Sequence, residues 1–380
     1  MLNRAPRAAD NTGVERADLE RLLRVLVESD GSDLHVKAGS PPKIRVYGEL
    51  IAVEGEPTLT ADTAAELVAV GLPDEASHRL ETAGEADFAL SMPGLGRFRV
   101  NVFRQRGSMA MAVRRVRSEV PTFEELGLPD VINRLSDEPR GLILVTGPTG
   151  SGKTTTLAAM VDRINRTRSC HIITIEDPVE FLHSDRRASV NQREIGLDTM
   201  DFPSAMRAAM RQDPDVILVG EMRDEETVRA ALSAAETGHL VLSTLHTIDA
   251  TETVNRIVDF FPPYQQTQIR LALAGSLRGV ICQRLVPRMG GMGRVAALEV
   301  LVANGRVAQS IINPGRGADI TEIIREGEYY GMQTFDQALA RLYADGKIGL
   351  RDALAAASNP HDLKVTLARS GLVTAAEAAG

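Results

Sequence analysis

The sequence has little cysteine, no long apolar run and no excess of basic residues, and each scarcity excludes a class of protein. Cys170 and Cys282 are the only cysteines among 380 residues, which excludes a disulfide framework and a four-thiolate zinc site built from one chain. No apolar run reaches the ~20 residues that cross a bilayer, and the opening MLNRAPRAADNTG has no hydrophobic signal core. The sequence therefore predicts a soluble cytoplasmic protein with no membrane span of its own.

The charge balance limits the partners. A formal net charge of −8 argues against a protein whose main task is to coat nucleic acid, so no nucleic-acid partner is expected. A hydrophobic content of 43% over 380 residues supports packed cores in two or three domains.

A glycine-rich phosphate loop is the strongest motif present. Residues 141–160, GLILVTGPTGSGKTTTLAAM, are typical of an apolar strand, a tight turn and a helix that begins at Lys153, and they satisfy G-x-x-x-x-G-K-[ST]. Glycines let successive backbone N–H groups converge on one anion, and the helix N-terminus adds positive potential. We expect Lys153 to neutralise the β and γ phosphates and the Thr154 hydroxyl to hold Mg²⁺. The predicted nucleotide-binding residues are Gly147, Pro148, Thr149, Gly150, Ser151, Gly152, Lys153, Thr154 and Thr155.

Strands and helices alternate after this loop, which predicts a doubly wound α/β sheet with its ligand at the carboxyl ends of the strands. Apolar strands at 171–175, 216–219 and 239–244 are followed by Glu176, Glu221 and His246. Because parallel strands end at the same edge of a sheet, we expect these three side chains to lie beside the phosphate loop.

The chemistry of these side chains suggests their roles. A nucleotidase usually places an acid for Mg²⁺ after the apolar strand, followed by a glutamate that orients the attacking water. Gly220 occupies the acid position here, so Glu221 keeps the water-orienting role and the metal depends on Thr154 and Glu176. His246 either contacts the γ-phosphate and senses its loss or is an ordinary hydrogen-bonded histidine at a strand end, and the residues alone leave both open.

The first third of the chain predicts a small α+β domain. A helix over 14–28 is followed by strands at 33–36, 43–50, 88–91, 97–103 and 109–116 and by helices at 60–71 and 73–81. Seven arginines and no acidic residue lie between Arg97 and Arg117. These arginines either lie on a solvated face of the sheet or donate a guanidinium to a phosphate site on another domain or subunit. The residues alone favour neither interpretation.

The remaining segments complete the organisation. A long helix over 264–282, a hairpin over 283–302 that turns at 290–293, and helices at 307–312, 319–326, 332–345 and 350–357 are expected. The domain prediction is an N-terminal domain over 14–117, a linker over 118–122, an ATPase core over 123–302, a helical region over 303–358 and a flexible tail over 359–380.

Six segments together resemble the motor ATPases of type IV pili and type II secretion. They are GSDLHVKAG (31–39), GPTGSGKTTTLAAM (147–160), IITIEDPVEF (172–181), DPDVILVGEMRD (213–224), TGHLVLSTLHT (237–247) and GVICQRLVPR (279–288). The third to fifth are similar to the Asp box, Walker B segment and His box of that superfamily. GMQTFDQAL (331–339) and the shortage of cysteine for a zinc loop resemble the retraction, or twitching-motility, branch, whereas RVAQSIIN (306–313) departs from the AIRNLIRE-like helix of that branch.

The resemblance implies a fold, an activity and partners. The N-terminal domain would be PAS-like and the core RecA-like, and ATP with Mg²⁺ would bind between the core of one subunit and the N-terminal domain of the next in a homohexamer. Arg99 and Arg104 match the trans-acting arginines of the family, Glu176 the Asp-box acid, Glu221 the catalytic glutamate and His246 the sensor. The expected partner is a pilus platform protein of the inner membrane, at whose cytoplasmic face the hexamer would work.

The expected function is an ATPase motor that retracts type IV pili. A pilus-extension or type II secretion ATPase is the alternative within the same class. A nucleic-acid-stimulated translocase, prompted by the arginine run, and a nucleotide-binding regulator that hydrolyses nothing are alternatives of other classes.

Overall fold

The structure, a computed structural model, describes residues 14–46, 48–117, 119–291, 293–315 and 319–373. The chain divides into two compact units, Met1–Ser118 and Glu119–Gly380, which we name the N-terminal unit and the C-terminal unit. Each is described by itself. None of the helices that the structure describes combines the length and apolar character needed to span a bilayer.

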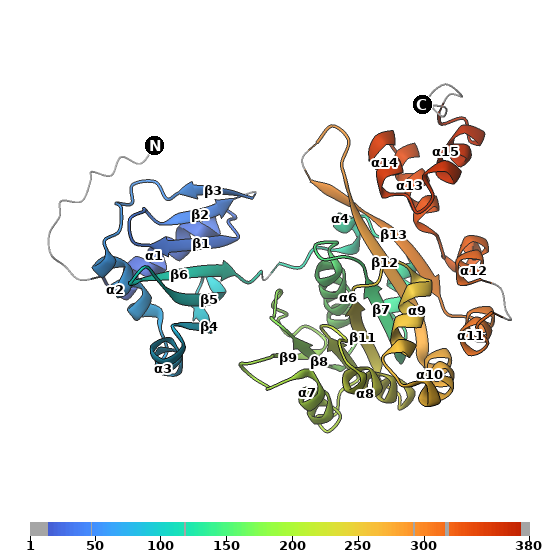
Figure 1. Cartoon of the computed structure of the whole chain (residues 1–380), viewed down its shortest axis with the longest axis horizontal. Coiled ribbons are helices and arrows are strands. Elements are labelled where there is room, and N and C mark those ends of the chain that lie inside the picture. The colour runs from blue at the N-terminus through green and yellow to red at the C-terminus, as the bar shows by residue number, and fades with distance from the viewer. Residues whose placement is uncertain (1–13, 47, 118, 292, 316–318, 374–380) are drawn as a thin grey trace. The chain divides into compact units, whose positions relative to one another are not determined.

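The N-terminal unit is an antiparallel sheet packed against helices (Figure 1). The strand order is β3-β2-β1-β6-β5-β4. The elements are α1 (Arg16–Glu28), β1 (Asp33–Lys37), β2 (Lys43–Val46), β3 (Glu49–Ala52), α2 (Ala61–Gly71), α3 (Asp74–Ala83), β4 (Glu85–Met92), β5 (Gly96–Gln105) and β6 (Ser108–Arg115). Leu19, Leu23 and Leu26 recur on one face of α1 and share a core with Phe98 and Val100 of β5. The predicted α+β character of this part is confirmed.

One predicted strand of this unit is wrong. The sequence predicts a single strand over 43–50, but β2 and β3 are two antiparallel strands in which Lys43 lies opposite Ala52. Gly48 between them has φ +91°, a left-handed conformation that glycine adopts without steric cost. The chain therefore reverses direction within a segment whose composition is typical of one strand.

The C-terminal unit is built around a seven-stranded sheet of order β13-β12-β7-β11-β10-β8-β9. Six adjacent strands, β12, β7, β11, β10, β8 and β9, are parallel to one another, and the edge strand β13 is antiparallel to β12. The strands are β7 (Gly141–Thr146), β8 (His171–Glu176), β9 (Ser189–Glu194), β10 (Val216–Val219), β11 (Leu240–Leu245), β12 (Leu277–Pro287) and β13 (Arg294–Val302). The edge strand β9 was not predicted.

Helices cover both faces of this sheet. On β7, Leu142 and Leu144 belong to one buried core, whereas Ile143 and Val145 belong to another. Alternate strand residues thus pack on opposite faces, which makes the strands apolar throughout. The helices of this region are α4 (Phe123–Leu126), α5 (Val131–Ser136), α6 (Lys153–Thr167), α7 (Phe202–Ala209), α8 (Glu225–Glu236), α9 (Ala250–Asp259) and α10 (Pro263–Ser276). The doubly wound α/β class is confirmed.

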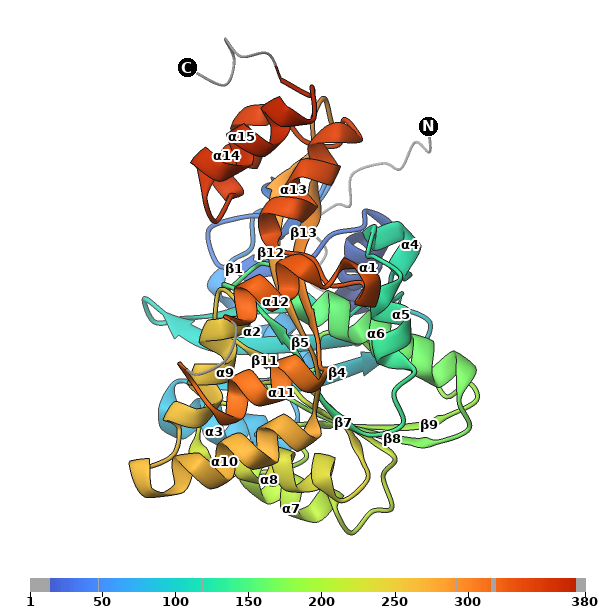
Figure 2. The same cartoon turned by 90° about the vertical axis from the view of Figure 1, so that its right-hand side faces the viewer.

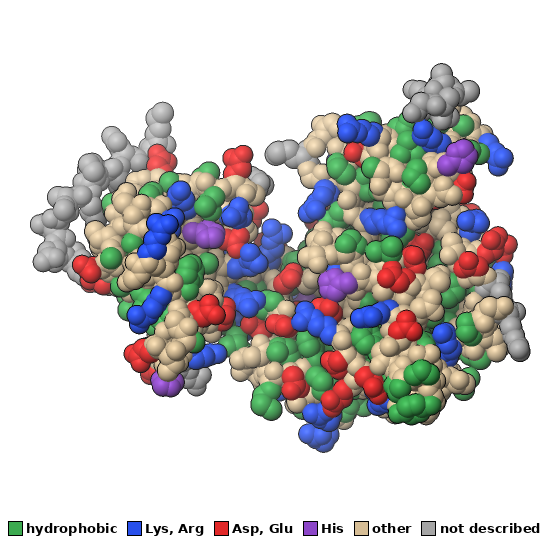
Figure 3. Space-filling view, viewed as in Figure 1, with side chains coloured by type: hydrophobic (Ala, Val, Ile, Leu, Met, Phe, Trp, Pro, Cys, Tyr) green, Lys and Arg blue, Asp and Glu red, His purple; other side chains and the backbone are tan. Residues whose placement is uncertain are grey.

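The last part of the unit is helical and lies along the β12–β13 hairpin, as the views in Figures 1 and 2 agree. Its elements are α11 (Gly305–Ile312), α12 (Ile320–Glu326), the short 3₁₀ helix η1 (Glu328–Tyr330), α13 (Phe335–Ala344), α14 (Leu350–Ala356) and α15 (Pro360–Arg369). Acidic and basic side chains are interspersed over the face of this unit drawn in Figure 3.

Two further predictions are corrected here. The helix predicted over 264–282 ends at Ser276, and the next residues form β12, where Ile281 pairs with Val145 and Val300. An apolar run does not distinguish a buried strand from a buried helix, and pairing with β7 decides the matter. The flexible tail predicted over 359–380 is wrong over 360–373, because Leu363 and Leu367 of α15 are buried in a core of the C-terminal unit. The rest of that prediction, over 374–380, lies outside the described residues.

Candidate active site

Lys153 is held inside the phosphate loop by the loop itself. β7 ends at Thr146, the loop follows, and Lys153 is the first residue of α6. The Lys153 ammonium donates to the carbonyl oxygens of Gly147 at 2.8 Å and Pro148 at 3.1 Å, and the residue is 9% exposed. Burial lowers the pKa of Lys153, while the charges of Glu221 and Glu180 oppose that shift. The Lys153 ammonium is therefore held at the bend of the phosphate loop.

Two loop glycines are required by close approach of β12. A Cβ on Gly147 would overlap the carbonyl oxygen of Gln283, and a Cβ on Gly152 would lie 2.7 Å from the Gln283 side-chain nitrogen. The other side-chain atom of Gln283, Oε1, accepts a hydrogen bond from the Thr156 hydroxyl at 2.8 Å. Gln283 thus supports the loop from behind. Sequence reasoning missed this role because no local pattern connects residue 283 with residue 147.

Glu221 lies between two basic side chains. Its Oε2 is 2.8 Å from Arg223 Nη2 and its Oε1 is 3.1 Å from His246 Nε2. Burial acts to raise the pKa of Glu221, but Arg223 and His246 outweigh it, so the pKa lies below its usual value. Glu221 is therefore a carboxylate at neutral pH. Sequence reasoning placed Glu221 and His246 at this edge but gave Arg223 no role.

Glu176 is held by one residue of its own strand, β8, and by one residue of the neighbouring strand, β9. Its Oε1 accepts hydrogen bonds from the Thr174 hydroxyl at 2.6 Å and from Gln192 Nε2 on β9 at 3.2 Å. Burial raises the pKa of Glu176, and these two hydrogen bonds oppose the shift. Gln192 also donates to the carbonyl oxygen of Phe181 at 2.8 Å, which ties the loop after β8 to β9.

Gly220, at the position of the usual acid, packs closely against the end of β8. A Cβ there would lie 3.2 Å from the carbonyl oxygen of Ile175 and 3.4 Å from Cα of Glu176. A side chain at 220 would therefore require the Ile175 carbonyl to shift by a few tenths of an ångström. This close packing favours the glycine found in the sequence.

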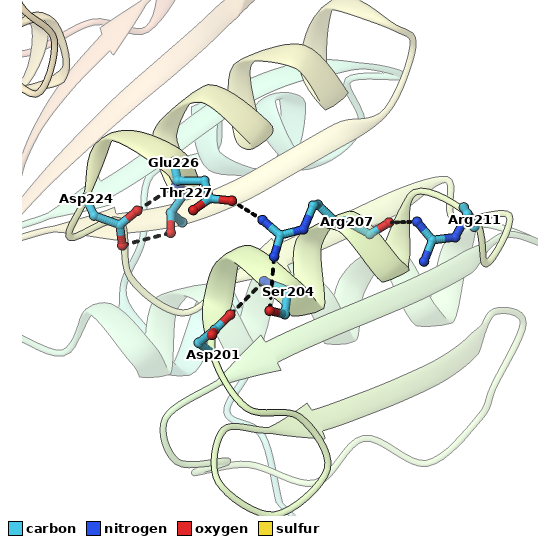
Figure 4. A network of polar contacts seen from close by, with 7 residues as sticks. All are labelled: Asp201, Ser204, Arg207, Arg211, Asp224, Glu226 and Thr227. Atoms are coloured by element: carbon cyan, nitrogen blue, oxygen red, sulfur yellow. Dashed lines mark hydrogen bonds and ion pairs between the residues drawn. The ribbon is translucent and has the colours of Figure 1, made fainter.

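The segment after Glu221 is fixed by a helix cap. Asp224 accepts hydrogen bonds from the backbone N–H of Thr227 at 2.8 Å and from its hydroxyl at 3.0 Å, which caps α8 (Figure 4). Glu226 on the same turn pairs with Arg207 of α7. The segment that carries Glu221 and Arg223 is thus anchored at β10 on one side and at the start of α8 on the other.

One cavity of about 460 Å³ collects most of the predicted site residues. Thr149, Gly150, Gly152, Lys153, Thr154 and Thr155 line it together with Glu176, Glu221 and His246. The other three predicted loop residues, Gly147, Pro148 and Ser151, are not among the residues that line it. Residues that the sequence did not single out also line the cavity, among them Arg223, His183, Leu285 and Arg294.

The donors for a metal ion are few. No group of three or more His, Cys, Asp and Glu side chains that could hold a metal occurs among the residues the structure describes. Thr154 and Glu176 line the same cavity. Mg²⁺ commonly keeps several waters and binds through one or two protein oxygens plus substrate phosphates, so this sparse donor set fits Mg²⁺ that arrives with a nucleotide.

Arg99 and Arg104 lie on β5 of the N-terminal unit. Arg99 is 3.9 Å from Asp87 Oδ1, and Arg104 is exposed near the strand end. Successive strand residues point to opposite faces, so the two arginines project from opposite faces of β5. Arg114 and Arg115 of the same run pair with Asp33 and Asp30. Part of the arginine run is thus neutralised within the unit, and the role of Arg99 and Arg104 at a phosphate stays a prediction.

Comparisons with known proteins identify the family of this chain. The family described as "Type II/IV secretion system protein" matches residues 8–333. The type IV pilus retraction ATPase PilT of Pseudomonas aeruginosa is 46% identical, over 91% of this chain and 99% of that protein. The type IV pilus ATPase PilU of the same organism is 42% identical, over 92% of this chain and 91% of that protein.

A solved structure supports the same assignment. The crystal structure of the pilus retraction motor PilT with bound ADP matches with a TM-score of 0.83 and 46% identity, covering 91% of this chain and 98% of that one. The chain therefore belongs to the type II/IV secretion system protein family and is a PilT-like P-loop ATPase.

Proposed function

We propose that this chain is the subunit of an ATP-driven motor that retracts type IV pili. The observation that carries the proposal is the shared cavity of Lys153, Glu221 and His246, in a chain similar to a retraction ATPase over nearly the whole length of both. The phosphate loop binds the triphosphate, and ATP hydrolysis supplies the work.

Each group has one task in this proposal. Lys153 exchanges its carbonyl partners for the β and γ phosphates. Glu221 orients the attacking water, and His246, which touches Glu221, contacts the γ-phosphate. Mg²⁺, when bound, neutralises charge on the phosphates. The Thr154 hydroxyl and Glu176 would hold it.

Coupling of ATP hydrolysis to movement requires a second subunit. We propose a homohexamer in which Arg99 and Arg104 of one subunit approach the phosphates bound by its neighbour. The negative charge of the γ-phosphate then holds two neighbouring subunits together, and its loss lets them separate. Repeated around a ring, this motion would turn a platform protein at the cytoplasmic face of the inner membrane. No nucleic acid takes part.

The experiment is deletion of the gene in its host and complementation with the wild-type chain or with Glu221→Gln, with surface pili and twitching measured. We expect the deletion strain to carry excess pili and not to twitch, and only the wild-type chain to restore retraction. Cells without pili would instead indicate an extension motor. Purified protein must release phosphate from ATP with Mg²⁺, and many-fold stimulation by DNA would favour a translocase.

A further inference from the structure

Arg223 lines the cavity, but the proposed hydrolysis reaction gives it no task. Its Nη2 lies 2.8 Å from Glu221 Oε2, and its Nη1 lies 4.0 Å from Asp177 Oδ2. Both carboxylate oxygens of Glu221 are thereby engaged, one by Arg223 and one by His246. The Asp224 cap, one residue later, limits how far the Arg223 backbone can move.

We propose that Arg223 is a positioning residue that holds the Glu221 carboxylate in one orientation for hydrolysis. The inference rests on the proposed function, since it assumes that Glu221 orients the attacking water. Arg223 acts through Glu221 and is not itself a group that contacts the reacting phosphate.

The physical argument depends on what fills the cavity. An ion pair with a half-exposed partner contributes little in water, and 59% of the Arg223 side chain is exposed. A nucleotide in the cavity removes water around Glu221 and so strengthens the pair. The planar guanidinium directs Nη2 to Glu221 and Nη1 toward Asp177, and a lysine ammonium, with one nitrogen, does not reproduce this arrangement.

The charged groups around Glu221 predict the direction of change. Lys153 from α6, His246 after β11 and Arg223 face its carboxylate, and Asp177 faces Arg223 from the loop after β8. Removal of Arg223 leaves burial, which favours the protonated form, opposed by fewer positive charges. The pKa of Glu221 then rises. As the pH is lowered, the variant therefore loses activity at a higher pH than the wild type does.

The test is a double-mutant cycle with Arg223→Met and Glu221→Gln, measured as ATP hydrolysis against pH. We expect Arg223→Met to lower kcat by about tenfold to a hundredfold. The acid limb of the pH profile should move to higher pH, and Arg223→Lys should recover part of the loss. In the Glu221→Gln background, Arg223→Met should cause almost no further loss, since the two residues act as one unit.

Arg325→Met is the matched control. Arg325 on α12 pairs with Glu322 at 3.5 Å, its side chain is 58% exposed against 59% for Arg223, and it lies outside the cavity lining. We expect it to leave kcat and the pH profile unchanged. The proposal is overturned if Arg223→Met costs as much in the Glu221→Gln protein as in the wild type, or if it raises KM for ATP without moving the acid limb.

A direct titration separates this failure from failure of the proposed function. The Glu221 carboxyl is followed by ¹³C NMR of glutamate-labelled protein and assigned by its absence from Glu221→Gln. A raised pKa in Arg223→Met supports the positioning role even if the wild-type chain does not hydrolyse ATP, which would reject only the motor. An unchanged pKa rejects the role of Arg223 while leaving the motor intact.

Discussion

Gln283 and Thr156 join strand β12 to helix α6 by a buried hydrogen bond of 2.8 Å directly behind the phosphate loop. Gln283 is 3% exposed and Thr156 is 1% exposed. The same glutamine approaches both Gly147 and Gly152. The curvature of the loop thus depends on a strand that lies more than a hundred residues further along the chain.

Gln283→Leu should weaken nucleotide binding and lower stability. The substitution keeps much of the volume but leaves the buried Thr156 hydroxyl without its acceptor, at a cost of about 1–3 kcal/mol in the free energy of unfolding. Urea unfolding and titration with a fluorescent ADP analogue measure the two effects. Gln309→Leu, at an exposed position on α11, is the control. Equal behaviour of the two variants would show that the Gln283 side chain does not support the loop.

Two glycines of the loop should respond very differently to alanine. At Gly147, φ is +139° and a Cβ would overlap the backbone of Gln283, so Gly147→Ala should abolish nucleotide binding. At Gly150, φ is +77° but nothing lies within 4 Å of the added Cβ, so Gly150→Ala should cost only about 1–2 kcal/mol of backbone strain. Binding of ADP measured by calorimetry distinguishes them. Similar affinities for the two variants would contradict the close approach of β12.

Glu299 should make stability depend on pH. This carboxyl on β13 is 5% exposed and accepts the backbone N–H of Ala250, at the start of α9, at 2.9 Å. Burial raises the pKa of Glu299 from 4.5 to about 7. The folded chain therefore binds its proton more tightly than the unfolded chain does. The resulting stability is fully present below about pH 4.5 and is lost as pH rises through 7.

Between pH 5 and pH 8 this loss amounts to about 2.5 kcal/mol. Glu299→Gln removes the titration, so its free energy of unfolding should fall less over that interval by about this amount. Urea unfolding at the two pH values is the measurement, and Glu328→Gln, with a side chain 74% exposed, is the control. An identical pH dependence in wild type and Glu299→Gln would reject the assignment.

Helix α15 should be part of the stable fold. Leu363 is 1% exposed and belongs to the core of the C-terminal unit. Leu363→Ala should lower the free energy of unfolding by about 2–5 kcal/mol, because it leaves a cavity among packed side chains. Leu372→Ala, at a position 39% exposed, should change it much less. A chain ended at residue 358 that unfolds at the same urea concentration as the full chain would refute this prediction.

The site shows which of its parts a sequence pattern can reveal. The phosphate loop, Glu221 and His246 follow apolar strands within a few residues, so local patterns and the rule that parallel strands end at one edge suffice to place them. Gln283 and Gln192 acquire their roles only through contacts with distant segments, whereas Arg223 contacts Glu221 two residues away. Gln192, on the unpredicted strand β9, reaches Glu176 across the sheet, and nothing in its neighbourhood along the chain indicates that contact.

The errors in the fold have the same origin. Residues 277–282 follow a helix without a break and, apart from Arg278, carry no polar side chain, so only pairing with β7 makes them a strand. Leu363 and Leu367 are four residues apart, a spacing typical of one face of a helix. The alanine content of the last residues nevertheless favoured the prediction of a flexible tail.

By itself the sequence determined that this chain binds a triphosphate on a parallel sheet, because strand periodicity, glycine content and the phosphate-loop spacing act over short distances. The tertiary structure alone decided that β12 supports the loop and that Gly220 packs closely against the end of β8. Those features depend on the close packing of strands and loops that are distant in the chain, where a single Cβ or one hydrogen bond changes the outcome.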